Sequence, residues 1–295
     1  MNAIPTLSFF EKLYLPESVP CTLEEIIILI RTRRWEAVIT AYRASLVAGD
    51  KEGARKQKGQ LPGFTPSGVF RGGHRASQLE RYSGIVGLDF DHVSNPKGLA
   101  ALFRQQACTL AFFVSPGGEG LKVFVRVDTP REAHAAAFAA VAACYEQLAG
   151  IFCDRACKDI SRCCYVSNDP EAYYDPKAEV FTTASVLPAQ LFVHDWLRAH
   201  PAVEGNRNQT VYRLGCEANR RGFGCDETAV FCIPLMHAPD FADEEIRQAL
   251  SSAYQGNKME YATRPKGQKD KTANLATDTI SGEELRERTP LLPLE

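Results

Sequence analysis

The sequence has almost no excess of charge of either sign. Its 295 residues include 34 Lys and Arg against 36 Asp and Glu, which gives a net charge of −2. This balance excludes a protein that binds polyanions through a uniformly basic surface. Any surface that binds an anion must therefore be local.

Long apolar segments are also missing. Runs such as Ile26–Ile30 are far shorter than the roughly 20 residues that a helix needs to cross a membrane. The first residues, Met1–Thr6, lack the basic and apolar stretches of a secretory signal peptide. We therefore expect a cytoplasmic protein with no membrane partner, and its ten cysteines should be reduced thiols.

Four of these cysteines cluster without the spacing of a zinc knuckle. Cys153, Cys157, Cys163 and Cys164 follow the pattern Cys-x3-Cys-x5-Cys-Cys rather than two CxxC pairs. Because neighbouring residues of a strand face opposite sides, Cys163 and Cys164 could not readily share one ion. Buried or half-buried thiols are favoured here over a zinc site.

Length and composition indicate an ordinary globular protein with room for two domains. The hydrophobic content is 45% and the charged content is 24%. Strands mixed with helices between 85 and 182 predict an α+β domain over 1–186. Helical spacing then predicts a small all-α domain over 187–256, and a polar segment without apolar periodicity predicts a flexible tail over 257–295.

The N-terminal third contains two helix signals and a basic segment. Residues 1–20 suggest a lead-in, after which Thr22 and Glu25 form a capping box for a helix, and a second helix is expected over 34–48. The segment 50–82 has three acids and two glycine turns, and it suits either a polyphosphate or nucleic acid contact or a solvated basic loop. Its cations are Lys51, Arg55, Lys56, Lys58, Arg71, Arg75 and Arg81.

Alternation and turn signals predict the elements of the first domain. Two strands, 109–115 and 121–127, flank a glycine turn and should form a hairpin. Helices are expected over 96–106 and over 129–149, the latter ended by Gly150. Further strands are expected at 161–166 and 179–182.

Two carboxylates close the apolar strand Ile85–Asp91. Val86, Leu88 and Phe90 should face a core, so Asp89 and Asp91 should point together to the other face. Paired carboxylates suit Mg²⁺ or Mn²⁺. The alternative is the end of a strand running into a loop, where Asp is common.

A glycine turn and a third carboxylate follow in the chain. Glycines permit close approach of a phosphate to backbone N–H groups, although such a hairpin is often only a turn. Asp154 supplies a third carboxylate, and Lys158 and Arg162 could meet a triphosphate or form a surface ion-pair cluster. The turn and the strand after it contain Ser115, Gly117, Gly118, Gly120 and Lys122.

Carboxylates, a phosphate-binding turn and nearby cations together predict a metal-dependent nucleotidyl-transfer site. In such a site two divalent ions activate a 3′-hydroxyl and steady the pyrophosphate leaving group. The substrates of such a site are a nucleoside triphosphate and a strand with a free 3′-hydroxyl.

Three segments in this order resemble the motifs of the archaeo-eukaryotic primase superfamily. They are Val-Gly-Leu-Asp-Phe-Asp (86–91), Val-Ser-Pro-Gly-Gly-Glu-Gly-Leu-Lys (114–122) and Phe-Cys-Asp (152–154) with a later Ser-Arg (161–162). More narrowly, they resemble the VirE-like N-terminal domain of Bacteroides mobile elements. Gly-Asn-Arg-Asn (205–208) and Glu-Ala-Asn-Arg-Arg-Gly (217–222) are similar to a primase C-terminal helical domain.

The resemblance implies an RRM-like primase-polymerase core that acts in DNA replication. It implies that Asp89, Asp91 and Asp154 bind Mg²⁺ or Mn²⁺, and that Ser115 to Lys122 contact the incoming nucleotide. One position departs from the pattern, because active primases usually have His where this chain has Lys122. Lysine binds phosphate as a point charge but lacks the neutral donor and acceptor of imidazole.

Two functions remain open at this point. One is a primase-polymerase of a mobile element, which would extend a primer on a single-stranded DNA template with NTPs or dNTPs. Arg71 and Arg75 would then bind nucleic acid. A helicase would be encoded separately, since no Gly-x4-Gly-Lys-Ser/Thr motif is present. The other is a catalytically degenerate primase fold that binds nucleic acid or nucleotide, which Lys122 and the near-neutral charge favour. A rolling-circle initiator is disfavoured because no His-x-His pair occurs.

Overall fold

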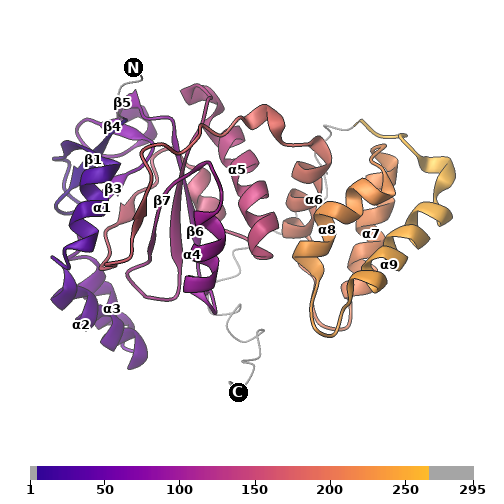
Figure 1. Ribbon diagram of the computed structural model, residues 1–295, viewed down its shortest axis with the longest axis horizontal. Coiled ribbons are helices and arrows are strands. Elements are labelled where there is room, and N and C mark those ends of the chain that lie inside the picture. The colour runs from indigo at the N-terminus through magenta and orange to yellow at the C-terminus, as the bar shows by residue number, and fades with distance from the viewer. Residues whose placement is uncertain (1–4, 266–295) are drawn as a thin grey trace.

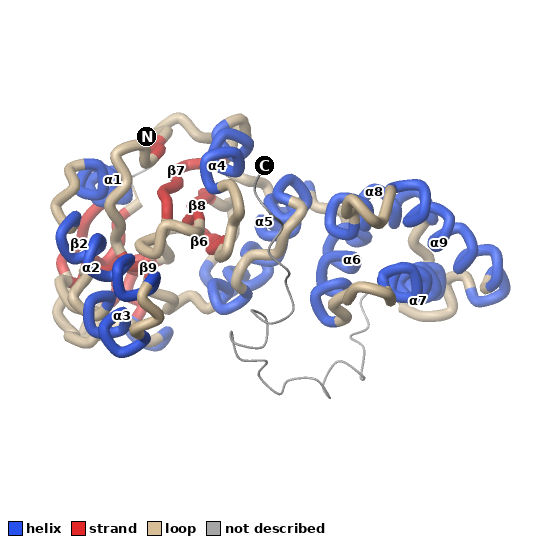
Figure 2. The backbone as a smooth tube through the Cα atoms, turned by 90° about the horizontal axis from the view of Figure 1, so that it is seen from below, coloured by secondary structure: helices blue, strands red, loops and turns tan. Residues whose placement is uncertain are grey.

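The computed structural model describes residues 5–265, which form an α+β part followed by a helical part (Figure 1). The α+β part is built around an antiparallel sheet in the order β10-β7-β8-β6. The helices α6, α7, α8 and α9 gather on the far side of α5 from this sheet (Figure 2). An α+β class with antiparallel sheets is therefore confirmed.

One face of the central sheet is covered by α4 and α5. Alternate residues of β6 and β8, among them Val86, Leu88 and Val123, pack with Phe103 and Phe138 from these helices in the first core. The predicted hairpin is confirmed, because β7 pairs with β8 in antiparallel register. The elements involved are β6 (Ile85–Phe90), α4 (Pro96–Arg104), β7 (Thr109–Val114), β8 (Leu121–Arg126), α5 (His134–Ala149) and β10 (Tyr173–Tyr174).

The other face packs against a second antiparallel sheet, in the order β2-β1-β3-β9, and against α1. Phe113 and Phe124 of the central sheet contact Phe64 of β3, with ring centroids 6.4 and 5.6 Å from Phe64. The elements are β1 (Thr6–Phe10), β2 (Val19–Thr22), α1 (Leu23–Arg31), β3 (Gly63–Thr65) and β9 (Cys164–Tyr165).

Two predictions for the N-terminal third are wrong. The lead-in expected over 1–20 is wrong for the described residues 5–20, because β1 is paired on both sides and its Leu7 is fully buried. The basic segment 50–82 is not a loop either, since it contains a helix and three strands. These elements are α3 (Lys51–Lys58), β3, β4 (Gly68–Phe70) and β5 (Leu79–Tyr82), and they follow α2 (Glu36–Val47). The capping box of Thr22 and Glu25 is confirmed.

Smaller differences concern the ends of elements. The helix expected from 129 begins as a 3-10 turn, Arg131–Ala133, and Gly150 ends it in the left-handed conformation as expected. The strand expected over 161–166 is only the two residues of β9. Residues 179–182 contribute a single bridge, between Phe181 and Val127, instead of a strand.

The helical part has its own core, formed by residues between 189 and 250. Its helices are α6 (Pro188–Ala199), α7 (Arg207–Arg220), α8 (Cys225–Met236) and α9 (Asp243–Gly256). The predicted flexible tail is wrong for residues 257–265, because Arg264 pairs with Glu217 at 2.9 Å. The remainder of the predicted tail, 266–295, lies outside the described residues. Within 5–265, the helices are all too short or too polar to cross a membrane.

Candidate functional site

The alternation predicted for β6 is confirmed. Val86, Leu88 and Phe90 are buried in the first core, whereas Asp89 lies on the opposite face of the strand. Asp91 follows immediately after the strand ends, at the rim of a pocket. The carboxylates therefore face the space between the two sheets, as alternation requires.

Asp89 is paired across the sheet with Lys122. The two residues are register partners on β6 and β8, and the Lys122 ammonium donates to Asp89 Oδ2. Their side chains are only 10% and 16% exposed, respectively. Burial lowers the pKa of the Lys122 ammonium. The second oxygen, Asp89 Oδ1, is buried without a hydrogen-bond partner in the described part of the chain.

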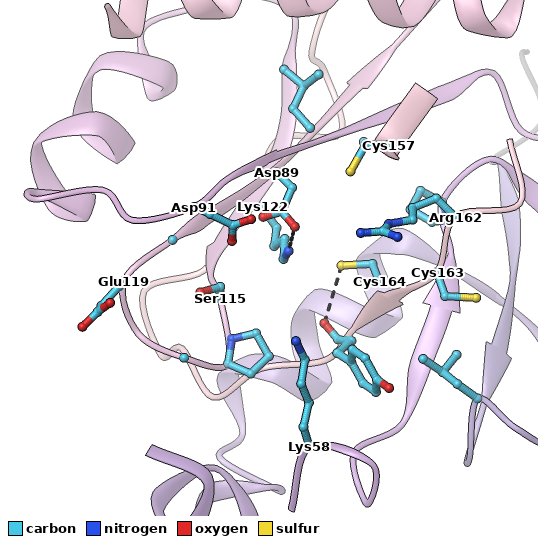
Figure 3. Close-up of a pocket in the computed structure, with 18 of the residues that line it drawn as sticks. Lys58, Asp89, Asp91, Ser115, Glu119, Lys122, Cys157, Arg162, Cys163 and Cys164 are labelled. Carbon is cyan, nitrogen blue, oxygen red and sulfur yellow. Dashed lines mark hydrogen bonds and ion pairs between the residues drawn. The ribbon is translucent and has the colours of Figure 1, made fainter. Parts of the chain in front are cut away.

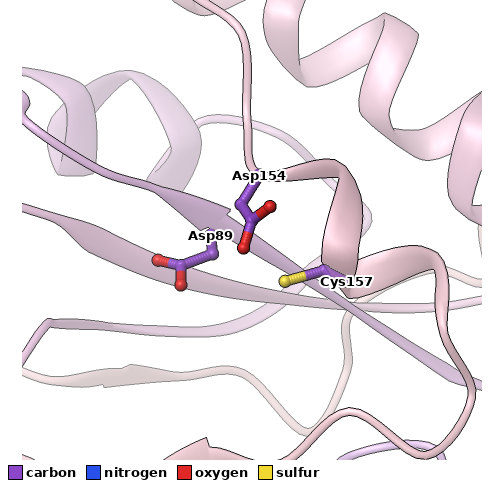
Figure 4. A group of neighbouring side chains, drawn as sticks. All are labelled: Asp89, Asp154 and Cys157. Atoms are coloured by element: carbon purple, nitrogen blue, oxygen red, sulfur yellow. The ribbon is translucent and has the colours of Figure 1, made fainter. Parts of the chain in front are cut away.

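Asp154 lies beside Asp89 because the chain after α5 runs along β6. Its backbone N–H donates to the carbonyl oxygen of Asp89 at 2.8 Å. Its carboxylate caps a short 3-10 helix, Arg155–Lys158, and accepts from Arg162 at 3.0 Å. Asp89, Asp154 and Cys157 each place a ligand atom within 4.8 Å of the others (Figure 4).

Asp91 is near this group but does not belong to it. Burial and the neighbouring carboxylate of Asp154 raise the pKa of Asp91 above its usual range. His92, Lys58 and Arg162 act in the opposite direction. Asp91 therefore lies within the electrostatic influence of Asp154, and its charged form is disfavoured relative to an ordinary aspartate.

The glycine turn between β7 and β8 is held in place by several contacts. The Arg43 guanidinium donates to the Pro116 carbonyl at 2.9 Å. Two of the turn's own N–H groups are already used, because Ser115 donates to Gly120 and Gly118 donates to Ser115. A phosphate would therefore rely on the remaining N–H groups and on the Ser115 hydroxyl. The turn therefore offers fewer free backbone N–H groups to a phosphate than the glycine pattern predicts.

These elements enclose a pocket of about 960 Å³ (Figure 3). Four cations line it: Arg43 from α2, Lys58 from the end of α3, Lys122 from β8 and Arg162 from the loop before β9. Beside Arg43, α2 contributes the apolar side chains of Leu46 and Val47. The volume lies at the upper end of the range for small-molecule sites.

The structure brings most of the predicted site residues to this pocket, but not all. Its lining includes Asp89, Asp91, Ser115, Gly117, Gly120, Lys122 and Arg162. Asp154 is not part of the lining, but its carboxylate forms an ion pair with Arg162, which is. Gly118, Lys158, Arg71 and Arg75 are not part of the lining. Arg71 instead lies 3.9 Å from Glu80, and its side chain is 85% exposed.

The sequence patterns do not identify three residues of the site. Arg43 lies in the middle of α2, and nothing in its helical spacing marks it as a contact of the glycine turn. Lys58 is one of many cations in a basic segment, and only the fold selects it. Cys157 is evident in the sequence as part of the cysteine cluster, but its neighbours in space are carboxylates. Of the four clustered cysteines, Cys153 and Cys164 are buried and Cys157 and Cys163 are half-buried.

Comparison with known proteins adds one similarity. Residues 56–174 match the family described as BT4734-like, N-terminal domain. The matched segment runs from α3 to β10, so it contains the pocket cations Lys58, Lys122 and Arg162 and the group of Asp89, Asp154 and Cys157. The fourth pocket cation, Arg43, lies before the matched segment. No curated protein and no solved structure matches the chain.

Proposed function

We propose that the chain is a metal-dependent nucleotidyltransferase of the primase-polymerase class, belonging to a mobile element. It would add NTPs or dNTPs to a primer on a single-stranded DNA template. The observation that carries the proposal is the meeting of carboxylates, a glycine turn and four cations at one pocket. A separately encoded helicase would open the duplex.

The donor set fits a divalent cation. Asp89 Oδ1 is a buried acceptor without a partner, and such an atom costs free energy unless a cation or donor satisfies it. Asp154 offers a second carboxylate within reach of the same point. When bound, Mg²⁺ or Mn²⁺ would supply charge stabilisation for phosphoryl oxygens.

The chain's own residues would hold and orient the nucleotide. Lys58 and Arg162 present positive charge to a triphosphate, and guanidinium can bind phosphate oxygens bidentately. The glycine turn, held by Arg43, would limit how the phosphates sit. The apolar side at Leu46 and Val47 suits the base or sugar.

The order of elements supports the proposed primase-like core. The sequence β6-α4-β7-β8-α5 is the beginning of a βαββαβ arrangement, the topology of RRM-like sheets. In the described residues no strand follows α5 beside β6, since β10 pairs with β7 at the other edge of the sheet. The Asp154 N–H nevertheless donates to the Asp89 carbonyl, on the side of β6 where a last strand would lie. This is the geometry in which the first and third motifs would meet.

Template-dependent incorporation of labelled nucleotides, with Mg²⁺ or Mn²⁺, tests the proposal. Asp89→Asn and Asp154→Asn should each abolish incorporation. Arg162→Ala should lower it at least tenfold, whereas Lys158→Ala, four positions away and outside the pocket lining, should keep most of it. Equal losses in both cation variants, or incorporation that survives both Asp variants, would contradict the assignment.

A second function is favoured by the Asp89–Lys122 ion pair. The ammonium already neutralises one oxygen of the first carboxylate, so the pocket could bind nucleotide or nucleic acid without catalysis. In that case single-stranded DNA or a nucleotide binds with no incorporation. Arg162→Ala would then weaken binding, and Asp89→Asn would leave it intact.

A further inference from the structure

The thiol of Cys157, which lies outside the three sequence motifs, lies beside the carboxylates of Asp89 and Asp154. Cys157 Sγ is within 4.8 Å of a carboxylate oxygen of Asp89 and of Asp154 (Figure 4). Within the described residues this is the only group of three or more such side chains. Its composition is two hard oxygen donors and one soft sulfur donor.

The local backbone explains how the thiol comes to face the carboxylates. Asp154 is the N-cap of the 3-10 helix Arg155–Lys158, and Cys157 is three positions further along. Side chains three residues apart eclipse each other in a 3-10 helix, so both project from the same side. The hydrogen bond from the Asp154 N–H to the Asp89 carbonyl then holds this side of the 3-10 helix against β6.

A second, independent observation concerns the carboxylate of Asp89 itself. The Asp89 side chain is nine-tenths buried, and its Oδ1 has no partner in the described part of the chain. With metal–oxygen bonds of about 2.1 Å and metal–sulfur bonds of about 2.3 Å, three ligands of one ion lie about 3.0–3.8 Å from one another. The three ligand atoms lie within 4.8 Å of one another, so the side chains would draw together by up to about 1–2 Å around an ion.

We propose that Cys157 is a metal ligand together with Asp89 and Asp154, and that the site prefers a transition-metal dication of the Mn²⁺ or Zn²⁺ class to Mg²⁺. This inference rests on the metal-dependent function proposed above. Sulfur is a poor ligand for Mg²⁺, which takes oxygen, but it binds softer divalent ions well. Cys157 would bind as the thiolate, releasing its proton to solvent.

The test is a titration of the reduced, intact protein with Cd²⁺, which reports a thiolate ligand by charge-transfer absorption in the ultraviolet. Competition with Mn²⁺ and Mg²⁺ then ranks these ions at the same site. The variant is Cys157→Ser, and the matched control is Cys163→Ser, whose thiol lines the pocket outside the group of three. Circular dichroism verifies that both variants fold, and Asp154→Asn provides an independent loss of a ligand.

We expect the first equivalent of Cd²⁺ to give the thiolate band in the wild type and in Cys163→Ser. Cys157→Ser should lose the band and bind at least about tenfold more weakly, the loss that even an outer-shell partner causes. Mn²⁺ should displace Cd²⁺ at lower concentration than Mg²⁺. An unchanged band in Cys157→Ser, or binding without any band, overturns the inference and leaves the proposed function standing.

The two proposals fail in distinguishable ways. A thiolate site in a protein that incorporates no nucleotide would overturn the proposed transferase and keep the metal site. Failure of the wild type to bind any of the three ions would overturn the inference and the metal dependence of the proposed function together.

Discussion

At the scale of single residues, the ion pair of Asp89 and Lys122 sets the character of the pocket. Both side chains are mostly buried, and each compensates the charge of the other. Breaking a buried pair by removing one partner leaves an uncompensated charge, which costs more than the pair itself contributes. The lysine therefore has a structural role, whatever it contacts in a ligand.

Lys122→Met should lower the free energy of unfolding by about 3 kcal/mol, measured by urea denaturation. Asp89 would then be a buried carboxylate without its cation. The double variant Asp89→Asn with Lys122→Met should recover at least half of the loss, because no charge remains buried. Additive losses in the double variant would show that the pair is not coupled.

His134 is a second residue whose charge state depends on the fold. Its ring contacts the Tyr82 hydroxyl at 3.0 Å and the Ser67 hydroxyl at 3.5 Å. Burial lowers the pKa of His134 to about 4, outweighing the opposite effect of Asp159. The folded protein therefore keeps this imidazole neutral at pH values where the unfolded chain binds a proton.

Stability should fall between pH 7 and pH 5 because of His134. Its ordinary pKa is about 6.5, so below that value the unfolded state gains a proton that the folded state takes up only near pH 4. The contribution is about 1–2 kcal/mol lost at pH 5. Urea denaturation at both pH values should show a smaller decline for His134→Gln than for the wild type, and equal declines would refute this assignment.

At the scale of elements, the β7–β8 hairpin brings the glycine turn against the end of β6. A Cβ on Gly120 would lie 2.7 Å from the Phe90 carbonyl oxygen, which is backbone and cannot easily move. At Gly117 the nearest atom is a flexible Leu46 methyl group, 3.7 Å away. Gly120 is therefore required by the close approach of β6, whereas Gly117 has room for a methyl group.

Gly120→Ala should destabilise the protein by about 1–3 kcal/mol, the usual cost of overpacking, and should weaken ligand binding by displacing the turn. Gly117→Ala should change unfolding by less than about 0.5 kcal/mol, as expected for a substitution without a clash. Urea denaturation of the pair provides the comparison. A tolerated Gly120→Ala would mean that the turn is not held against β6.

At the scale of the whole molecule, Glu146 connects the helical part to the candidate site. This carboxylate of α5 is fully buried and pairs with Arg198 and with His194, the latter at 3.1 Å, both on α6. It also accepts from the Cys153 N–H at 3.1 Å, one residue before Asp154. The position of Asp154 is therefore tied to the packing of α6.

Glu146→Gln should cost about 3–5 kcal/mol, because Arg198 loses its buried counter-ion. Hydrogen exchange should become faster at Cys153 and Asp154 and along α6. Glu179→Gln, an exposed carboxylate, is the matched control and should leave both measurements unchanged. Exchange that accelerates only in α6 would show that the site is independent of the helical part.

The sequence by itself determined the features that depend on short-range periodicity. Alternation placed Val86 and Leu88 in the core and Asp89 on the opposite face, and the glycine pattern located the hairpin turn. Apolar spacing also predicted that the chain after residue 187 is helical, as α6 to α9 are. These features follow from the geometry of neighbouring residues, which the sequence contains directly.

Only the tertiary structure decided which side chains meet. Lys122 faces Asp89 because of cross-strand register, and Cys157 faces the carboxylates because the chain after α5 runs along β6. In the same way, the fold places Lys58 of the basic segment in the pocket lining, whereas Lys158 and Arg71 lie outside it. Such contacts join residues far apart in the chain, and no local pattern specifies which strands pair or which loop returns to them.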